Sequence, residues 1–420
     1  MINKNIQWIE EQSNRAPEER NTVCNLLLEI NDVNVTEHLS EGSIFERICI
    51  PIYGIADGLV HEWWKLLGSR DGGVSILNFR SGYIVPNMSM HTDGEMLYIN
   101  ARSIRYNDSK IKFLNSAHDA IGIEDGISFL NSFVEEVISR LKDSGLTSTS
   151  LSQRWRRIKN SEVNGERDFC LAAGALGLDP YQIDDAAAEM IEKFESFFSG
   201  ESLVEALSGS IGVDREKLLE WVQRMNTDTS TRYKLRELRR ISDQLNRNYN
   251  PQSGPAWSKG YKLAHMARRA LGMPEHAEFD NFKSLASKFG SYRSFALAPS
   301  VEGVKALRTE ASDSIKVHVR DRGRSGEAQS SHLFALARAI GDAICFPESD
   351  ISIVNDATSA YRQAAGRAFA AEFLAPSTEV KSMLEDKHDV SSISERFHVS
   401  ESVIKHQIEN NNRIEAAIAA

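Results

Sequence analysis

The spacing of apolar residues divides the N-terminal third of the chain into helical and strand-like stretches. Apolar residues crowd together at 26–30 and predict an early helix, and residues 50–67 predict a second one. Between 74 and 101 the period changes to two, and Asp93-Gly94 within it indicates a hairpin turn. We therefore predict a mixed α/β domain over residues 1–145.

Helical spacing dominates the next hundred residues, and we predict a helical module over 150–248. Its last segment surrounds a line of leucines and isoleucine with basic residues, namely Arg232, Lys234, Arg236, Arg239, Arg240 and Arg247. A basic helix face of this kind is a candidate contact for an anionic partner. The stretch 248–255 contains two prolines and a glycine and predicts a linker.

Beyond this linker the pattern predicts a helix, a strand and then two more helices. Residues 257–271 have helical spacing, and the alternation at 315–319 predicts a half-buried strand whose polar positions include Lys316 and His318. A polar loop leads into a helix over 331–345, and an alanine-rich helix follows. The sequence as a whole thus indicates a predominantly helical α+β fold.

The C-terminal segment predicts two short helices joined by a tight turn. Pro376 ends the alanine-rich helix, and a short helix follows over 377–386. Apolar residues then recur with helical spacing over 390–412, interrupted at His398-Val399-Ser400, where Ser400 is placed as an N-cap. We interpret this segment as a small helix–turn–helix.

The two helices on either side of residue 350 resemble the core of the ImmA/IrrE family of metallopeptidases. That family has a segment reading roughly Phe-x-Leu-Ala-His-Glu-Leu-Gly-His, followed by one reading Glu-x-x-Ala-Asn-x-Phe-Ala-Ala-Glu-Leu-Leu-Met-Pro. The matching scaffold letters here are Phe334, Leu336, Ala337, Gly341, Phe369, Ala370, Ala371, Glu372, Leu374 and Pro376. The resemblance covers about 257–412 and implies a domain with a zincin-like core, a small sheet plus an active-site-type helix pair, that ends in the helix–turn–helix. Active members of the family bind zinc between the two helices and cleave helix–turn–helix repressors.

The residues at the family's catalytic and metal-ligand positions differ from the family pattern. Where the family has two histidines, a glutamate between them and a glutamate ligand, this chain has Arg338 and Asp342, Ala339, and Gln363. Arginine has no lone pair for a metal, and alanine cannot act as a base. One carboxylate with an amide and no imidazole is a poor zinc site, so we expect no metal and no cofactor. The four-residue spacing predicts instead a side-chain pair between Arg338 and Asp342.

Composition narrows the class of protein further. The chain is 41% hydrophobic and 26% charged, values typical of a globular protein, and its net charge of −10 argues against broad affinity for nucleic acid. Its four cysteines are scattered, without metal or redox spacing. The sequence has neither an apolar run of about 18 residues nor the features of a signal peptide, so we expect a cytoplasmic protein.

These observations lead to one hypothesis and leave others open. By resemblance, the chain is a catalytically inactive relative that binds another protein in a bacterial stress-response or phage-defence system, such as a helix–turn–helix repressor or a defence-system subunit. The candidate contact residues are Arg232, Arg236, Arg239, Arg240, Lys316 and His318. The first alternative is an active zinc peptidase with ligands drawn from His318, His332, Asp342 or Glu372. The second is a DNA-binding regulator, and an unrelated protein with two core helices also stays open.

Overall fold

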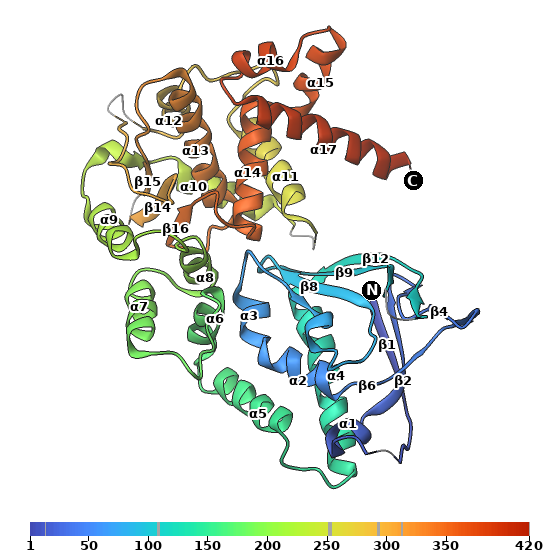
Figure 1. Cartoon of the computed structure of the whole chain (residues 1–420). Coiled ribbons are helices and arrows are strands. Elements are labelled where there is room, and N and C mark those ends of the chain that lie inside the picture. Colours follow the sequence, from blue (N-terminus) through green and yellow to red (C-terminus); the bar gives the residue numbers. More distant parts are fainter. Residues whose placement is uncertain (13, 107–109, 251–253, 292–294, 312–313, 420) are drawn as a thin grey trace. The chain divides into compact units, whose positions relative to one another are not determined.

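The computed structural model of the chain divides into two compact units, Met1–Ile191 and Glu192–Ala420 (Figure 1). It describes residues 1–12, 14–106, 110–250, 254–291, 295–311 and 314–419, with side chains through Asn410. Helices and antiparallel sheets occur in both units, so the predicted α+β class is confirmed. The finer predicted divisions, 1–145, 150–248 and 257–412, stay predictions. Part of the predicted 248–255 linker lies outside the described residues.

Unit 1 combines antiparallel sheets with helices. Its strands are β1 (Ile2–Trp8), β2 (Val23–Ile30), β3 (Val33–Asn34), β4 (His38–Ser40), β5 (Ser43–Phe45), β6 (Ile48–Pro51), β7 (Val74–Ser75), β8 (Asn87–Thr92), β9 (Met96–Arg102), β10 (Ile104–Arg105), β11 (Lys112–Phe113) and β12 (Ala117–Gly122). Its helices are α1 (Pro17–Arg20), α2 (Tyr53–His61), α3 (Trp63–Gly68), the 3-10 turn Ile76–Phe79, α4 (Ile123–Asp143), α5 (Ser150–Val163) and α6 (Arg167–Ala175), while α7 (Asp185–Glu195) crosses the unit boundary. The predicted hairpin is present as β8 and β9, paired from Asn87↔Arg102 to Thr92↔Leu97.

The predicted helix at 26–30 is wrong, because this segment belongs to strand β2. β2 pairs with β1 along its whole length, from Ile2↔Ile30 to Trp8↔Cys24. Leu26, Leu28 and Ile30 are buried, and Leu27 between them is half-buried. The period is therefore two, and the run of consecutive leucines concealed it.

Unit 2 holds a small antiparallel sheet of order β13-β15-β14-β16 and the helices around it (Figure 1). Its strands are β13 (Lys234–Leu235), β14 (Ala306–Ala311), β15 (Ser314–Val319) and β16 (Ile351–Val354). Its helices are α8 (Gly200–Ser208), α9 (Arg215–Thr227), the 3-10 turn Thr231–Tyr233, α10 (Leu238–Asn248), α11 (Ala256–Ala270), α12 (Phe282–Lys288), α13 (Gly326–Cys345), α14 (Tyr361–Leu374), α15 (Ser377–Glu385), α16 (Val390–Arg396) and α17 (Glu401–Ala419).

The predicted helix pair is present as α13 and α14, and α11 lies along α14 (Figure 1). A Cβ on Gly341 of α13 would lie 2.6 Å from the ring of Phe369 on α14. A Cβ on Gly260 of α11 would lie 2.4 Å from the carbonyl oxygen of Ala365. Glycine and alanine therefore let these three helices approach each other closely. α13 begins at Gly326, five residues before the predicted helix starts.

Two predictions about the basic segment and the strand need correction. Residues 232–247 do not form one basic helix, because Lys234–Leu235 is strand β13 and α10 begins only at Leu238. β13 pairs with β15, Lys234↔Lys316 and Leu235↔Ile315. β15 thus lies between β13 and β14, and all of its residues are buried rather than alternately exposed. A polar strand can be buried in this way when it is interior to a covered sheet.

Candidate functional site

Arg338 and Gln363 face each other across α13 and α14. The guanidinium of Arg338 donates to the carboxylate of Asp356, to the carbonyl oxygen of Asn355 and, over 3.0 Å, to Oε1 of Gln363. Arg338 is buried, and the charge of Asp356 offsets part of its loss of hydration. The position that the resemblance matches to a histidine ligand is thus occupied by a cation held to the loop after β16.

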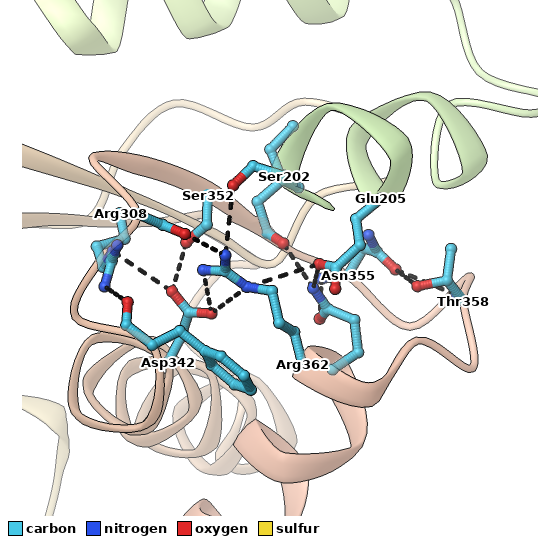
Figure 2. A network of polar contacts seen from close by, with 12 residues as sticks. Ser202, Glu205, Arg308, Asp342, Ser352, Asn355, Thr358 and Arg362 are labelled. Carbon is cyan, nitrogen blue, oxygen red and sulfur yellow. Dashed lines mark hydrogen bonds and ion pairs between the residues drawn. The ribbon is translucent and has the colours of Figure 1, made fainter. Parts of the chain in front are cut away.

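Asp342 lies one turn further along α13, between two buried arginines (Figure 2). Its carboxylate accepts from Nη2 and Nε of Arg362 over 2.8 and 3.1 Å, and Nε of Arg308 lies 3.4 Å away. The hydroxyl of Ser352 donates to it as well. Burial alone would raise the pKa of Asp342, but Arg362 and Arg308 offset this and hold the pKa below its ordinary value. Asp342 is a carboxylate at neutral pH.

Gln363 connects this cluster to helix α8. Its amide oxygen also accepts from the backbone N–H of Asn355 over 3.1 Å, and its amide nitrogen donates to Ile353 O (2.8 Å) and to Oε2 of Glu205 (3.0 Å). Glu205 is buried, and burial raises its pKa to about 8, with Arg362 acting in the opposite direction. Every donor and acceptor of the Gln363 amide is therefore used within the protein.

The predicted pair between Arg338 and Asp342 is wrong. Arg338 forms its ion pair with Asp356, and Asp342 forms its pairs with Arg362 and Arg308. Helical spacing places the two side chains one turn apart, but buried partners from other elements offer better geometry than a neighbour on the same helix. We call the group Glu205, Arg308, Arg338, Asp342, Arg362 and Gln363 the arginine network.

The residues of the arginine network do not fit a zinc ion. Its side chains supply three guanidiniums and no imidazole, and Ala339 beside it is a buried methyl group without a proton to transfer. A cation placed here would face Arg338, which is always charged. Across the described residues, no group of three or more histidine, cysteine, aspartate or glutamate side chains is arranged to hold a metal ion.

Glu372, one of the scaffold letters, is the centre of a second buried network. It is 0% exposed, and its carboxylate accepts from the backbone N–H of Ser377 over 3.2 and 3.1 Å, which caps the start of α15. It also accepts from the amide of Gln407 on α17 (2.8 Å), and its Oε1 lies 3.1 Å from Nε2 of His265 on α11. This hydrogen bond raises the pKa of His265 above its usual value. We call Glu372, His265, Ser377 and Gln407 the glutamate network.

The four ligands considered for a non-standard zinc site lie in separate surroundings. His318 lies against the ring of Tyr233, 4.4 Å between centroids, and burial with Lys316 nearby lowers its pKa to about 3. His332 accepts from the backbone N–H of Arg322 over 2.9 Å. Asp342 belongs to the arginine network and Glu372 to the glutamate network. The structure therefore does not bring these four side chains together.

The candidate contact residues separate into exposed and buried ones. Arg232, Arg236 and Arg240 are exposed, and Arg239 pairs with Glu310. Lys316 and His318 are 8% and 0% exposed, so neither side chain is available for contact with a partner. A partner segment that added as a strand to the outer edge of β15 would compete with β13, which pairs with Ile315 and Lys316, and with Ala298, whose backbone N–H donates to Val319 O.

Sequence reasoning missed Arg308, Arg362 and Glu205. Arg362 directly precedes Gln363 in an alanine-rich helix, and Arg308 lies among the buried first four residues of strand β14. A charged residue inside an apolar segment is a usable signal, because such a charge is rarely buried without a partner. Glu205 gives no comparable signal, since its partner Gln363 lies 158 residues away in the sequence.

No family model, curated protein or solved structure matches the chain. Within the described residues, no helix combines the length and the apolar character needed to cross a membrane.

Proposed function

We propose that the chain is a non-hydrolytic relative of the ImmA/IrrE metallopeptidases and acts by binding another protein. Its expected partner is a helix–turn–helix repressor or a subunit of a defence system, and its expected setting is the bacterial cytoplasm. In this proposal residues 257–412 keep the zincin-like scaffold and the terminal helix–turn–helix, while the chemistry of the site is lost.

The observation that carries the proposal is the arginine network. Positions 338, 342 and 363 correspond by resemblance to the metal ligands, and all three are engaged in buried hydrogen bonds and ion pairs. Hydrolysis by this scaffold needs a Lewis acid and a base at these positions. Arg338, Ala339 and Gln363 supply neither, and the carboxylate of Asp342 is paired with Arg362 and Arg308. Binding without cleavage is therefore the function that the residues support best.

The DNA-binding alternative has less support from the residues. The exposed side chains at the start of α17, the second helix of the terminal unit, include Glu401, Lys405 and Glu409, and Lys405 pairs with Glu401 over 3.0 Å. The carboxylates would repel phosphates at the position where a recognition helix meets DNA.

Co-expression with any helix–turn–helix protein that is encoded beside its gene tests the proposal. We expect a stoichiometric complex in which the partner keeps its intact mass by mass spectrometry. Partner fragments that exceed the amount of chain present, and that increase with time, would show turnover and contradict the proposal. A chain carrying Arg232→Glu and Arg240→Glu should form less complex if these exposed arginines contact the partner. Circular dichroism shows whether this variant is still folded.

A further inference from the structure

The loop that follows β16 is surrounded by cationic side chains from four elements. The backbone N–H of Lys305 donates to Val354 O (2.8 Å), and the backbone N–H of Arg320 donates to Lys305 O (2.9 Å). The start of β14 and the end of β15 therefore meet the end of β16 at one edge of the sheet, which places Lys305 and Arg320 beside the loop 355–358.

Two arginines reach the same loop from the helices. Arg338 of α13 donates to the carbonyl oxygen of Asn355 and to the carboxylate of Asp356. Nη1 of Arg367 on α14 lies 3.5 Å from Thr358 O. We call Lys305, Arg320, Arg338 and Arg367, arranged around Asp356, the Asp356 ring.

The Asp356 ring has more cations than carboxylates to pair with them. Asp356 is already shared, at 2.8 Å from Nζ of Lys305 and in contact with Arg338. Within the described part of the chain, Arg320 and Arg367 form no ion pair. Arg320 donates instead to Val301 O over 2.8 Å, and its Nε has no acceptor. Both side chains are half-buried, so the low hydration of each guanidinium is not offset by a partner charge.

The other carboxylates that act on these arginines do not remove the excess. Glu302 and Asp356 act on Arg320, and Asp356 and Glu205 act on Arg367. Burial, together with Arg338, lowers the pKa of Arg367 to about 10, whereas burial raises that of Glu205 to about 8. Asp342 also acts on Arg338, but it is itself paired with Arg362 and Arg308, and Arg322 adds a further cation beside Arg320. The ring therefore keeps an excess of positive charge, and the tip of the loop, Asp356 and Ala357, is exposed.

We propose that the Asp356 ring is the contact surface for an acidic peptide segment of a protein partner, whose carboxylates pair with Arg320 and Arg367. The inference rests on the proposed function and deepens it by naming the chemistry of the partner. Two half-buried guanidiniums beside a single loop match one or two carboxylates, which arginine binds with paired hydrogen bonds. Nucleic acid requires an extended cationic track, and the net charge of −10 opposes it.

Binding of a fluorescent hexaglutamate peptide to the full chain, followed by anisotropy, tests this inference. We expect Arg320→Gln and Arg367→Gln each to lower the affinity about tenfold, the effect of losing a charge-assisted hydrogen bond. Arg156→Gln, the same change at an exposed arginine of α5, is the matched control and leaves the affinity unchanged. Asp356→Asn removes the competing internal carboxylate and raises the affinity, a gain that a partly unfolded variant does not give.

Three results would overturn the inference. The first is equal hexaglutamate affinity in the wild-type chain and in the Arg320→Gln and Arg367→Gln variants. The second is equal affinity for hexaglutamate and hexaglutamine. The third is binding of inorganic phosphate or single-stranded oligothymidine through these two arginines without binding of hexaglutamate. None of these results concerns cleavage, so a chain that captures an intact partner while failing this test retains the proposed function and uses another surface.

Discussion

The two buried carboxylates of the neighbouring helices α13 and α14 are held by different kinds of partner. Asp342 accepts from Arg362 and lies beside Arg308, and both guanidiniums stay charged throughout the pH range of a folded protein. Glu372 is held by a backbone N–H, an amide and the imidazole of His265, which titrates near neutral pH. The ion pairs of Asp342 are therefore present throughout the pH range of the folded protein, whereas the contact between Glu372 and His265 changes with pH.

The two networks also differ in whether their residues match the pattern of the proposed ImmA/IrrE resemblance. The residues at positions 338, 342 and 363 differ from the pattern of the proposed resemblance and belong to a charged cluster, whereas Glu372 matches that pattern and connects α11, α14, α15 and α17. A residue that caps one helix and binds two others is needed for the packing of the domain whether or not any reaction takes place. A chain can therefore match the pattern at Glu372 without having the residues that hydrolysis needs.

The largest expected effect follows from removing the charge of Asp342. Asp342→Asn leaves Arg362 and Arg308 buried beside a neutral amide, and breaking a buried ion pair in this way lowers the free energy of unfolding by about 3–5 kcal/mol. Urea denaturation measures this loss. Asp243→Asn, on the exposed face of α10, is the control and changes the free energy of unfolding by less than about 0.5 kcal/mol. Similar values for both variants would contradict the description of the arginine network.

Removal of Glu372 should have a smaller and more local effect. Glu372→Ala removes the carboxylate that accepts from the N–H of Ser377 and one of the two acceptors of the Gln407 amide, whose other acceptor is Ala375 O, and this lowers the free energy of unfolding by about 1–3 kcal/mol. Hydrogen exchange should show faster opening of α15 and α17, with β14 and β15 unchanged. Uniform acceleration across unit 2 would show that the glutamate network does not act locally.

The close packing of α13 against α14 brings Arg338 next to Gln363, and two glycine substitutions test this packing. Gly341→Ala pushes a methyl group against Phe369, an overpacking that costs about 1–3 kcal/mol. The control lies on the facing helix. A Cβ on Gly366 would meet its nearest atom, Arg338 O, at 3.5 Å, so Gly366→Ala fits and stabilises the helix by about 0.5–1 kcal/mol. Thermal denaturation should give shifts of opposite sign, and shifts of equal sign would contradict this spacing.

The smallest expected effect is the pH dependence of the glutamate network. The pKa of His265 is raised in the folded state, so its contribution is complete below pH about 6.5 and is lost as the pH rises through the folded pKa. The pKa of Asp342 is lowered, so its contribution is present above about 3.8 and is lost only as the pH falls through the folded pKa. The stability difference between wild type and His265→Gln should therefore be smaller at about pH 8.5 than at about pH 5.5, since the contribution of His265 falls as the pH rises through its raised pKa. Denaturation at both pH values measures it, and a constant difference would contradict the assignment.

Local pattern predicted much of the framework. The hairpin of β8 and β9, the strand at 315–319 and the helices α11, α13 and α14 follow from apolar spacing and turn residues. The segment at 26–30 was misread because three consecutive leucines fit a helix as well as a strand paired on both sides. Pairing with β15, which no local pattern records, also ended the predicted basic helix at 234–235.

The site was less predictable, because its partners come from distant parts of the chain. Arg362 lies 20 residues from Asp342, and Gln363 lies 158 residues from Glu205. The absence of a metal, which the resemblance implies, stays a prediction, and the spacing rule predicted the wrong partner for Arg338. Burial decides between a weak surface pair and a closed ion-pair cluster, and single-sequence patterns do not give burial for charged residues.

The measurement that tests the central claim most directly is the zinc content of the purified full chain after equilibration with zinc and removal of the excess. The arginine network predicts no zinc above the level of the Asp342→Asn variant. The positions that the proposed resemblance matches to zinc ligands hold a guanidinium, an amide and the carboxylate of Asp342, which is already paired with two arginines. One zinc per chain, lost on Asp342→Asn substitution, would contradict the account and restore the metalloenzyme.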